Sequence, residues 1–280
     1  MFNTLYRKSV AVINSLYILI WSIFFLKPIL WFKFWFSFAP DKTITLDSLS
    51  VVIRSKNLTS KLVDLYMAAS CILSKQYSPE AFHIQKTDTI IDVGAHIGSF
   101  SIFAARRARE GRVYSFEPDP DNYEQLKKNV IANNLKNITT TRKAVFNSSG
   151  TSYLYKDKNN SAEHGLYRKN TQRIEISTIS IEDIFKQNNI DKCDLLKLDC
   201  EGTEYDIIFN AQGGVMDKIE KIVMECHTPD FFGITNPLYS QENMLQHLNS
   251  LGFKTRVKPE NAMHGLIFAK RSDDKISKKN

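Results

Sequence analysis

The chain has 280 residues, 43% of them hydrophobic, and a formal net charge of +7. Such a length suits one large domain with additions, or two small ones, with enough apolar residues for a sizeable core. Four bases without an acid in residues 1–40 supply +4, and five bases against two acids in residues 270–280 supply +3, so residues 41–269 are neutral. A neutral body excludes the broad basic face of a nucleic-acid-binding domain. Basic ends fit contact with an anionic membrane, or simply a gain in solubility.

The four cysteines have neither metal-binding nor redox spacing; they are Cys71, Cys193, Cys200 and Cys226. Three of them fall in segments expected to be buried strands or strand ends. We interpret them as reduced core thiols of a cytosolic domain.

The N-terminus carries an apolar run without charge, VAVINSLYILIWSIFFL, at residues 10–26. At about 1.5 Å per residue this run would span roughly 25 Å, the short end for a membrane helix. An aromatic stretch at 29–38, interrupted by one lysine, suits the lipid headgroup boundary. We predict that residues 1–40 associate with a membrane through residues 10–38, as a span or a shallow hairpin. The alternative is a pair of apolar helices packed on the domain or on a partner subunit.

From about residue 88 the pattern alternates between strands and helices. The expected strands of the alternation are 89–93, 112–117, 138–145, 193–199 and 218–227. The expected helices are 98–110, 119–133, 180–186, 203–211 and 241–251. A hairpin of 253–258 and 264–271 closes the chain, and 151–155 and 173–179 are extended segments outside the alternation. Strands separated by helices predict a doubly wound α/β sheet. The polar run 155–173 is the expected mobile loop over a site.

The stretch IIDVGAHIGSF, residues 90–100, ends a strand and opens a helix. In a doubly wound sheet, ligands bind beyond the carboxyl ends of the strands. We expect Gly94 to let the backbone approach a ligand, and Gly98 to open the helix and pack close to the strand, with free N–H groups at the helix start. The spacing D-x-G-x-x-x-G differs from the G-x-G-x-x-G of dinucleotide sites. The alternative is that Asp92 only caps the helix and Gly98 only eases packing.

The next strand ends in Glu117, twenty-three residues after Gly94. An acid at that point can bind both ribose hydroxyls of an adenosine. Asp92 is unfavourable beside a pyrophosphate but suits a cationic ligand, so the pair fits S-adenosylmethionine better than NAD. Tyr123 and Lys127 match the Y-x-x-x-K pair of short-chain dehydrogenases, but they come too early in the fold and are interpreted as a helix-surface pair.

Three segments, IDVGAHIGSFS, VYSFEPDPDNYEQLKKN and LLKLDCEGTEYDII, resemble the FkbM-like family of S-adenosylmethionine-dependent O-methyltransferases. The resemblance covers roughly residues 50–270, and its most specific piece is K-x-D-x-E-G-x-E at 197–204. It implies the class I methyltransferase fold, a Rossmann-like, doubly wound seven-stranded sheet with the last strand antiparallel. The lead-in departs from the family pattern, because the acid usual after the arginine-containing stretch is not evident around 57–61.

The resemblance also implies a binding site for S-adenosylmethionine at four strand ends. The methionine part is assigned to Asp92, Gly94, Ala95 and Gly98, the ribose to Glu117 with Pro118 and Asn122 nearby, the adenine border to Lys143 and Ala144, and the transferred methyl to Asp199. The expected organisation is a membrane-associated segment (1–40), a lead-in (41–85), the S-adenosylmethionine-dependent methyltransferase domain (86–271) and a basic tail (272–280).

Candidate chemical groups gather at the tips of the fourth and fifth strands: Asp199, Glu201, Glu204, Glu225 and His227. Residues two apart on an extended chain point to one side, so the pairs at 199/201 and 225/227 can converge. An alcohol needs a base to remove its proton, and an imidazole titrates near neutrality. We hypothesise that His227 or Asp199 is this base and that Glu201 and Glu204 hold the loop or the acceptor hydroxyls.

Three alternatives stay open at this cluster and in the nearby loops. No residue is assigned to a metal, but the same acids and His227 could instead hold a divalent ion. Glu204 could also merely cap a helix, with His227 a satisfied strand-end histidine. His96 is a spacer in the glycine turn or a substrate contact, and His164 is a solvated loop residue or a lid contact.

The predicted function is an S-adenosylmethionine-dependent O-methyltransferase on the cytoplasmic face of a membrane. Its acceptor is a small-molecule hydroxyl, or that of a sugar in a glycolipid or surface glycan, and nucleic acid is not a partner. The alternatives are an N-methyltransferase on the same fold and a non-catalytic adapter that keeps the fold. Asp92, Glu117 and Asp199 together count against an adapter, which would not need all three.

Overall fold

The computed structural model describes residues 41–55, 57–156, 161–162, 164–167, 172–212, 214–260 and 264–272. The predicted membrane-associated segment, much of the polar run 155–173 and most of the basic tail lie outside these residues. Within the described part of the chain, no helix combines the length and the apolar character needed to cross a membrane.

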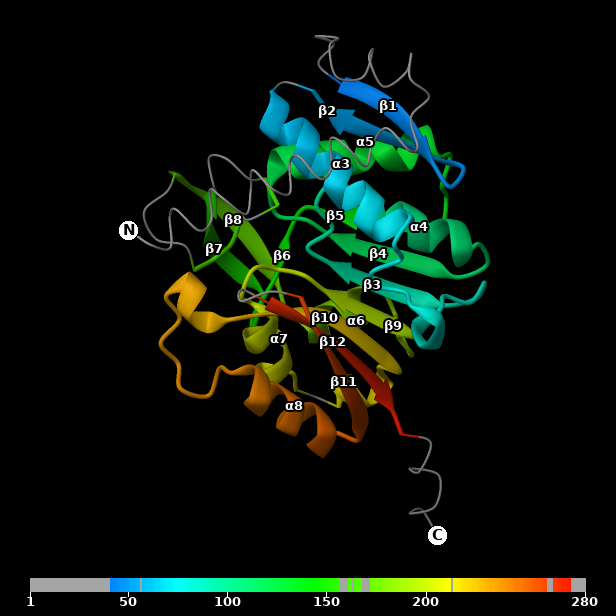
Figure 1. The fold of residues 1–280 in the computed structure, drawn as a ribbon. Helices are drawn as coiled ribbons and strands as arrows, with labels where there is room; N and C mark the ends of the chain where they lie inside the picture. The colour runs from blue at the N-terminus through cyan, green and yellow to red at the C-terminus, as the bar shows by residue number, and fades with distance from the viewer. Residues whose placement is uncertain are drawn as a thin grey trace.

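A seven-stranded sheet forms the centre of the molecule (Figure 1). Its strands are β3 (Thr89–Val93), β4 (Arg112–Phe116), β5 (Ile138–Thr141), β9 (Leu195–Leu198), β10 (Lys221–His227), β11 (Phe253–Pro259) and β12 (His264–Arg271). They lie in the order β11-β12-β10-β9-β3-β4-β5. β12 is antiparallel to both of its neighbours, while the pairs from β10 to β5 are parallel. The predicted doubly wound sheet with an antiparallel last strand is confirmed.

Helices cover both faces of this sheet (Figure 1). One face carries α3 (Leu58–Ile72), α4 (Ser99–Arg107) and α5 (Pro120–Ala132), together with the hairpin of β1 (Asp41–Leu46) and β2 (Leu49–Arg54). The other carries α6 (Ile181–Gln187), α7 (Glu204–Asn210) and α8 (Gln241–Ser250). The helix starts follow capping rules, since the side chain of Asp119 accepts from two backbone amides of the first turn of α5 and Pro120 occupies its first position.

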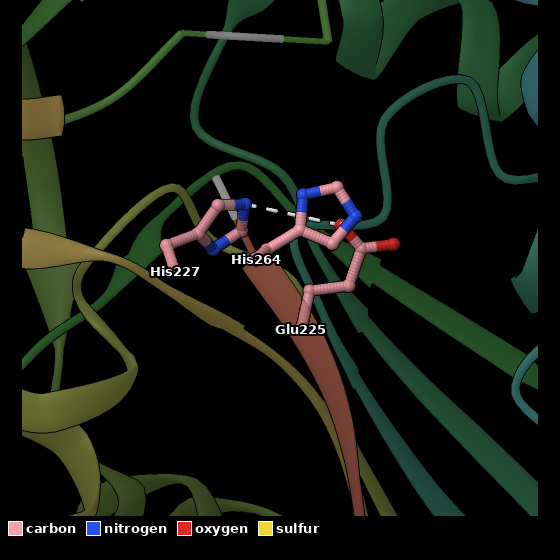
Figure 2. A group of neighbouring side chains, drawn as sticks. All are labelled: Glu225, His227 and His264. Carbon is pink, nitrogen blue, oxygen red and sulfur yellow. Dashed lines mark ion pairs between the residues drawn. The ribbon is translucent and has the colours of Figure 1, made fainter. Parts of the chain in front are cut away.

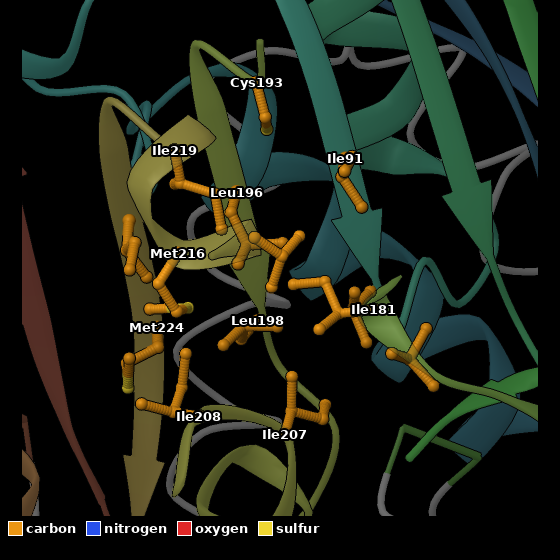
Figure 3. Packing of buried hydrophobic residues seen from close by; sticks show 14 of the residues in the cluster. Ile91, Ile181, Cys193, Leu196, Leu198, Ile207, Ile208, Met216, Ile219 and Met224 are labelled. Carbon is orange, nitrogen blue, oxygen red and sulfur yellow. The ribbon is translucent and has the colours of Figure 1, made fainter. Parts of the chain in front are cut away.

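The two cores follow from the alternation of side chains along the central strands. Ile90 and Val223 point into the first core, whereas their neighbours Ile91 and Met224 point into the second. Figure 3 shows part of the second core, where strands β3, β9 and β10 meet the helices. Cys193 and Cys226 lie in that core, and all four cysteines are free, as predicted.

The predicted strand at 138–145 is wrong beyond Thr141. The amide of Lys143 donates to the carbonyl of Thr141 in a tight turn, and the chain leaves the main sheet there. A second, three-stranded sheet then takes in β6 (Ala144–Val145), β7 (Gly150–Lys156) and β8 (Gln172–Ile179). The two extended segments expected outside the alternation are β7 and β8. Short 3-10 helices fill further connections at η1 (Glu80–Phe82), η2 (Val215–Lys218) and η3 (Pro229–Phe232), so β10 begins later than predicted.

Candidate active site

The glycine turn after β3 is fixed by close contact with two other segments. Gly94 and Gly98 have φ angles of +72° and +85°. A Cβ on Gly94 would lie 1.7 Å from the carbonyl oxygen of Asp199, and a Cβ on Gly98 would lie 2.3 Å from Cδ1 of Leu126. The structure thus shows one reason for Gly94, close contact with the loop after β9, and the predicted approach of a ligand stays a prediction. Gly98 allows close packing, but against α5 instead of the strand.

Backbone amides tie the turn to the end of β4. The N–H groups of Gly94 and Ala95 both donate to the carbonyl of Phe116, at 3.0 Å each. The amide of His96 donates to Oε2 of Glu117 (2.8 Å), and Oε1 of Glu117 accepts from the amide of Asp119 (2.9 Å). Burial raises the pKa of Glu117 to about 7 against the opposing effect of these hydrogen bonds. The predicted ribose acid therefore lies directly beside the turn.

Asp92 has a cationic partner within the chain. Its carboxylate is fully buried, accepts from Oγ of Ser101 (2.5 Å) and lies 3.1 Å from Nζ of Lys197. Nζ of Lys197 also donates to the carbonyl of Gly94 (2.8 Å). Burial opposes the charge of Lys197, but Asp92 and Asp199 outweigh it and raise the pKa of this ammonium. Lys197, in the K-x-D segment, therefore supplies a cation next to Asp92.

A buried ionic network connects the lead-in to the glycine turn. Nη2 of Arg54 lies 2.6 Å from Oδ1 of Asp64 and 3.0 Å from Nε2 of His96, and Nη1 donates to Asn122 (2.7 Å). Asp64 on α3 is therefore an acid partner of the lead-in arginine, just past the 57–61 stretch where none was evident. Burial first, and the charge of Arg54 second, hold the pKa of His96 well below its ordinary value. His96, for which the sequence left two roles open, is thus a neutral member of this network.

Tyr77 joins the tips of β9 and β10. Its hydroxyl lies 2.6 Å from Oε1 of Glu225 and 3.0 Å from Oδ2 of Asp199, and Gln76 donates to Glu225 as well (2.8 Å). Burial, and then the neighbouring Asp199, raise the pKa of Glu225 to about 7. Sequence reasoning missed Tyr77, because it precedes Asp199 by 122 residues and nothing local indicates the contact.

Glu204 holds both a loop and an imidazole. Its carboxylate, fully buried, accepts from the amides of Cys200 and Gly202, at 2.9 Å each, and Oε1 lies 2.9 Å from Nδ1 of His227. On the other side of the ring, Nε2 of His227 lies 3.7 Å from Oε1 of Glu201. Burial lowers the pKa of His227, but the surrounding carboxylates outweigh it and raise this pKa well above its ordinary value.

His264 is a further member of this cluster that sequence reasoning missed. It faces His227 across the antiparallel pair of β10 and β12, with the ring centroids 5.4 Å apart. Its Nε2 lies 3.6 Å from Oε2 of Glu225 (Figure 2). The closing hairpin was predicted, but its alignment with β10, which brings the two histidines together, has no local signal.

A cavity of about 540 Å³ adjoins this cluster beyond the carboxyl end of β10. His227 and His264 form part of its wall. Much of the remaining wall is polar, with Tyr205, Thr228, Asp230, Thr235, Asn236, Tyr239, Ser240 and Gln241. The cavity thus offers many hydrogen-bonding groups next to the acids and histidines.

Residues 92–255 match the family described as Methyltransferase FkbM domain. The chain belongs to this family. It is therefore a methyltransferase, with the sheet order described above.

Two curated proteins and one solved structure are among those to which the chain is similar. Hexuronic acid methyltransferase AglP of Haloferax volcanii is 24% identical over 144 residues, 51% of this chain and 57% of AglP. The 31-O-demethyl-FK506 methyltransferase FkbM of Streptomyces tacrolimicus is 21% identical over 184 residues, 55% of this chain and 71% of that protein. The structure of precorrin-6y C5,15-methyltransferase from Geobacter metallireducens covers 82% of this chain and 95% of its own, with 13% identity and a TM-score of 0.43.

The other predicted residues of this FkbM-family methyltransferase lie around Glu117. Nδ2 of Asn122 is 3.4 Å from Oε1 of Glu117, and Pro118 follows Glu117 in the same loop. The amide of Glu117 donates to the carbonyl of Thr141 (3.1 Å), and Lys143 and Ala144 follow that carbonyl by two and three residues. This hydrogen bond thus brings the segment of the predicted adenine border beside the predicted ribose acid.

Two further predictions concern His164, whose side chain is only 9% exposed and therefore not the predicted solvated residue, and the pair of Tyr123 and Lys127. Nε2 of His164 lies 4.0 Å from Oδ2 of Asp119, so this loop residue approaches the start of α5. Nζ of Lys127 lies 5.4 Å from the ring of Tyr123 on the outside of α5. The Y-x-x-x-K match is therefore a helix-surface pair, as predicted.

Proposed function

We propose that this methyltransferase uses S-adenosylmethionine to methylate a hydroxyl group. One observation carries the proposal: a continuous series of contacts runs from the glycine turn to the polar cavity. Gly94 touches the backbone of Asp199, Tyr77 bridges Asp199 and Glu225, and Glu225 adjoins the histidine of the cavity wall, His264. A methyl donor at one end and an acceptor at the other would meet at Asp199.

The turn has polar atoms that fit the proposed cofactor. Glu117 presents a carboxylate suited to ribose hydroxyls at the carboxyl end of β4. Among the described residues, Nδ1 of His96 and Oγ of Ser99 are buried without a hydrogen-bond partner. Buried polar groups are almost always paired, so orphaned atoms on both sides of Gly98 favour a polar ligand at this helix start. S-adenosylmethionine supplies an activated methyl group on a sulfonium.

Methyl transfer requires alignment and one proton acceptor. In the proposed step, the acceptor oxygen forms a bond to the methyl carbon while the carbon–sulfur bond breaks and sulfur keeps the electron pair. The hydroxyl proton passes to the carboxylate of Asp199. Between the two predicted bases we favour Asp199, which lies against Gly94 of the turn, because in the metal-free protein the surrounding carboxylates raise the pKa of His227 and favour its protonated form. Glu204 holds the loop that carries Glu201.

The polar wall of the cavity favours a hydroxyl-rich acceptor, and we propose a sugar of a glycolipid or surface glycan. Hydroxyl and amide side chains of the wall, such as Asn236, Tyr239 and Gln241, can pair with sugar hydroxyls. The names of two relatives, a hexuronic acid methyltransferase and a 31-O-demethyl-FK506 methyltransferase, support an oxygen-bearing acceptor.

We further propose that the enzyme works at the cytoplasmic face of a membrane. The support is the uncharged apolar run and the aromatic stretch within residues 10–38. Membranes from cells that express the chain are washed in alkaline carbonate. Retention in the pellet is expected, and full release would contradict the membrane association while leaving the enzymatic proposal intact.

Calorimetry with S-adenosylmethionine tests the cofactor directly. The wild-type chain is expected to bind it, and Glu117→Ala is expected to lose the binding, while Glu124→Ala, an exposed acid on α5, keeps it. The second test transfers labelled methyl from the cofactor into a lipid and glycan extract, where Asp199→Asn should abolish incorporation. A wild-type chain that binds no cofactor would favour the non-catalytic adapter instead.

A further inference from the structure

Three side chains beside the cavity, two of which form part of its wall, place ligand atoms around one point (Figure 2). One atom each from Glu225, His227 and His264 lies within 4.8 Å of the others. Oε2 of Glu225 is 3.8 Å from Nε2 of His227 and 3.6 Å from Nε2 of His264. We propose that these three residues hold a divalent transition-metal ion.

The separations suit a shared ion better than direct hydrogen bonds. Nitrogen and oxygen ligands about 2.0–2.1 Å from a zinc-type ion in tetrahedral geometry lie roughly 3.3–3.4 Å apart. The separations of 3.6 and 3.8 Å exceed hydrogen-bond length but need to shorten by only a few tenths of an ångström. Movements of this size bring Oε2 of Glu225 to the distance at which it can share an ion with each imidazole, and all three ligand atoms lie within 4.8 Å of one another.

His227 is oriented as metal-binding histidines are. Such a residue usually directs its second ring nitrogen to a carboxylate, which fixes the tautomer and the ring. Nδ1 of His227 lies 2.9 Å from Oε1 of Glu204, and Glu204 is itself fully buried and fixed by two backbone amides. This contact leaves Nε2 of His227 facing Glu225 and Glu201.

The ligands stand on rigid strands. Glu225 and His227 are two apart on β10 and so point to one side, and His264 pairs with His227 in the register of β10 and β12. Glu201, on the loop after β9, has Oε1 3.7 Å from Nε2 of His227 and lies beside this ligand, outside the group of three. Sites built on strands are more precise than sites on loops, so the cluster is preorganised.

The composition of the cluster indicates the class of metal. Imidazole ligands suit zinc, iron and other transition metals, whereas magnesium prefers oxygen ligands and water. The cavity of about 540 Å³ beside His227 and His264 gives access from solvent. An ion here could bind an acceptor oxygen on its open side; this role rests on the proposed function, but the binding of the ion does not.

The test is a titration of the chelator-treated full-length protein with Mn²⁺, in which electron paramagnetic resonance reports the free ion. We expect one ion per chain, displaced by equimolar Zn²⁺ but not by a tenfold excess of Mg²⁺. His264→Gln should weaken binding at least about tenfold, whereas His83→Gln, a histidine exposed far from the cluster, should leave it unchanged. Thermal unfolding checks that each variant is folded.

Several outcomes would overturn the site. They are no Mn²⁺ binding below about 1 mM, His264→Gln binding as tightly as the wild type, or displacement by Mg²⁺ as effective as by Zn²⁺. If His264→Gln does not fold, Glu225→Gln decides, because it removes the charge and keeps the shape. Calorimetry with S-adenosylmethionine on the same samples separates the two proposals: intact cofactor binding without metal binding refutes only the metal, and the reverse refutes only the cofactor.

Discussion

His96 and His227 are equally buried histidines near strand ends of one sheet, yet their pKa values move in opposite directions. His96 is 6% exposed and His227 is 3% exposed. Burial and then Arg54 hold the pKa of His96 well below its ordinary value. Burial acts on His227 in the same sense, but the carboxylates around it outweigh burial and raise its pKa well above that value.

Neighbouring charges therefore account for the difference between these two sites, since burial lowers the pKa of both histidines. Desolvation disfavours a charged imidazole in both places, so only the sign of the neighbours distinguishes them. The end of the molecule proposed to bind the cofactor is organised around a cation, Arg54, and the end proposed to bind the acceptor is organised around carboxylates such as Glu204. Substitution of one of these charged neighbours, or of a titrating group near them, tests this difference.

The largest effect is expected from Asp64→Asn at the cofactor end. This change leaves the buried guanidinium of Arg54 without its 2.6 Å ionic partner. Breaking a buried ion pair from one side costs about 3–5 kcal/mol, because a charge stays buried and uncompensated. Chemical denaturation should show a loss of this size in the free energy of unfolding.

Asp47→Asn is the matched control for that experiment. It breaks the pair of Asp47 with Arg107, whose side chains are 52% and 29% exposed, at 3.2 Å. Exposed pairs contribute about 0–1 kcal/mol, so its effect should be small. Equal losses in the two variants would show that the buried network does not stabilise the lead-in.

The next largest effect is expected from Glu204→Gln at the acceptor end, in protein kept free of metal by a chelator. A hydrogen bond to a charged group contributes roughly 1.5–3 kcal/mol. The pKa of His227 is higher in the folded chain than in the unfolded chain, so protonation of this imidazole stabilises the fold. This stabilisation is complete below the unfolded pKa of about 6.5, and it is lost as the pH rises through the folded pKa. The cost of the variant should therefore be larger at pH 5.5 than at pH 8.5. A cost that grows with pH would contradict a protonated His227.

His96→Asn should show the opposite dependence on pH. The φ of His96 is +51°, a conformation that asparagine tolerates. Because the folded pKa of His96 is lowered, the unfolded chain takes up the proton below about pH 6.5 while the folded chain does not, so the wild type loses about 1 kcal/mol between pH 7 and 5.5. The variant has no imidazole to take up this proton, so its free energy of unfolding does not fall in this way. The difference in stability between wild type and variant should therefore be about 1 kcal/mol smaller at pH 5.5 than at pH 7. His83→Asn, an exposed histidine, serves as the control.

Local patterns predicted the elements well because they lie within single segments. TIIDV is short, β-branched and apolar, and Asp119-Pro120 marks the start of α5, so strand β3 and this helix were placed nearly to the residue. The strand predicted at 138–145 was continued too far, because the residues beyond Thr141 are just as suitable for a strand, and only the tertiary structure decides which sheet they join.

The candidate site was predicted less completely, because its contacts join distant segments. Glu117, Asp199, Glu204 and His227 could be found because strand ends bearing acids follow apolar runs. Their partners from the lead-in and from the last strand could not be found, because the positions of these partners depend on the packing of α3 and on the register of β10 and β12. These partners are Arg54, Asp64, Tyr77 and His264.

The last prediction, an effect of about 1.4 kcal/mol on the free energy of binding, concerns the pH dependence of cofactor binding at Glu117. Its pKa is raised to about 7, and the ionised carboxylate is the form that accepts ribose hydroxyls. The ionised fraction falls from about nine-tenths at pH 8 to one-tenth at pH 6, so affinity for S-adenosylmethionine should fall about tenfold. Glu117→Gln should bind weakly at both values, with no change between them. A wild-type affinity that stays constant would mean that Glu117 does not contact the ribose. The fold, and the contrast between the surroundings of His96 and His227, would not be affected by that result.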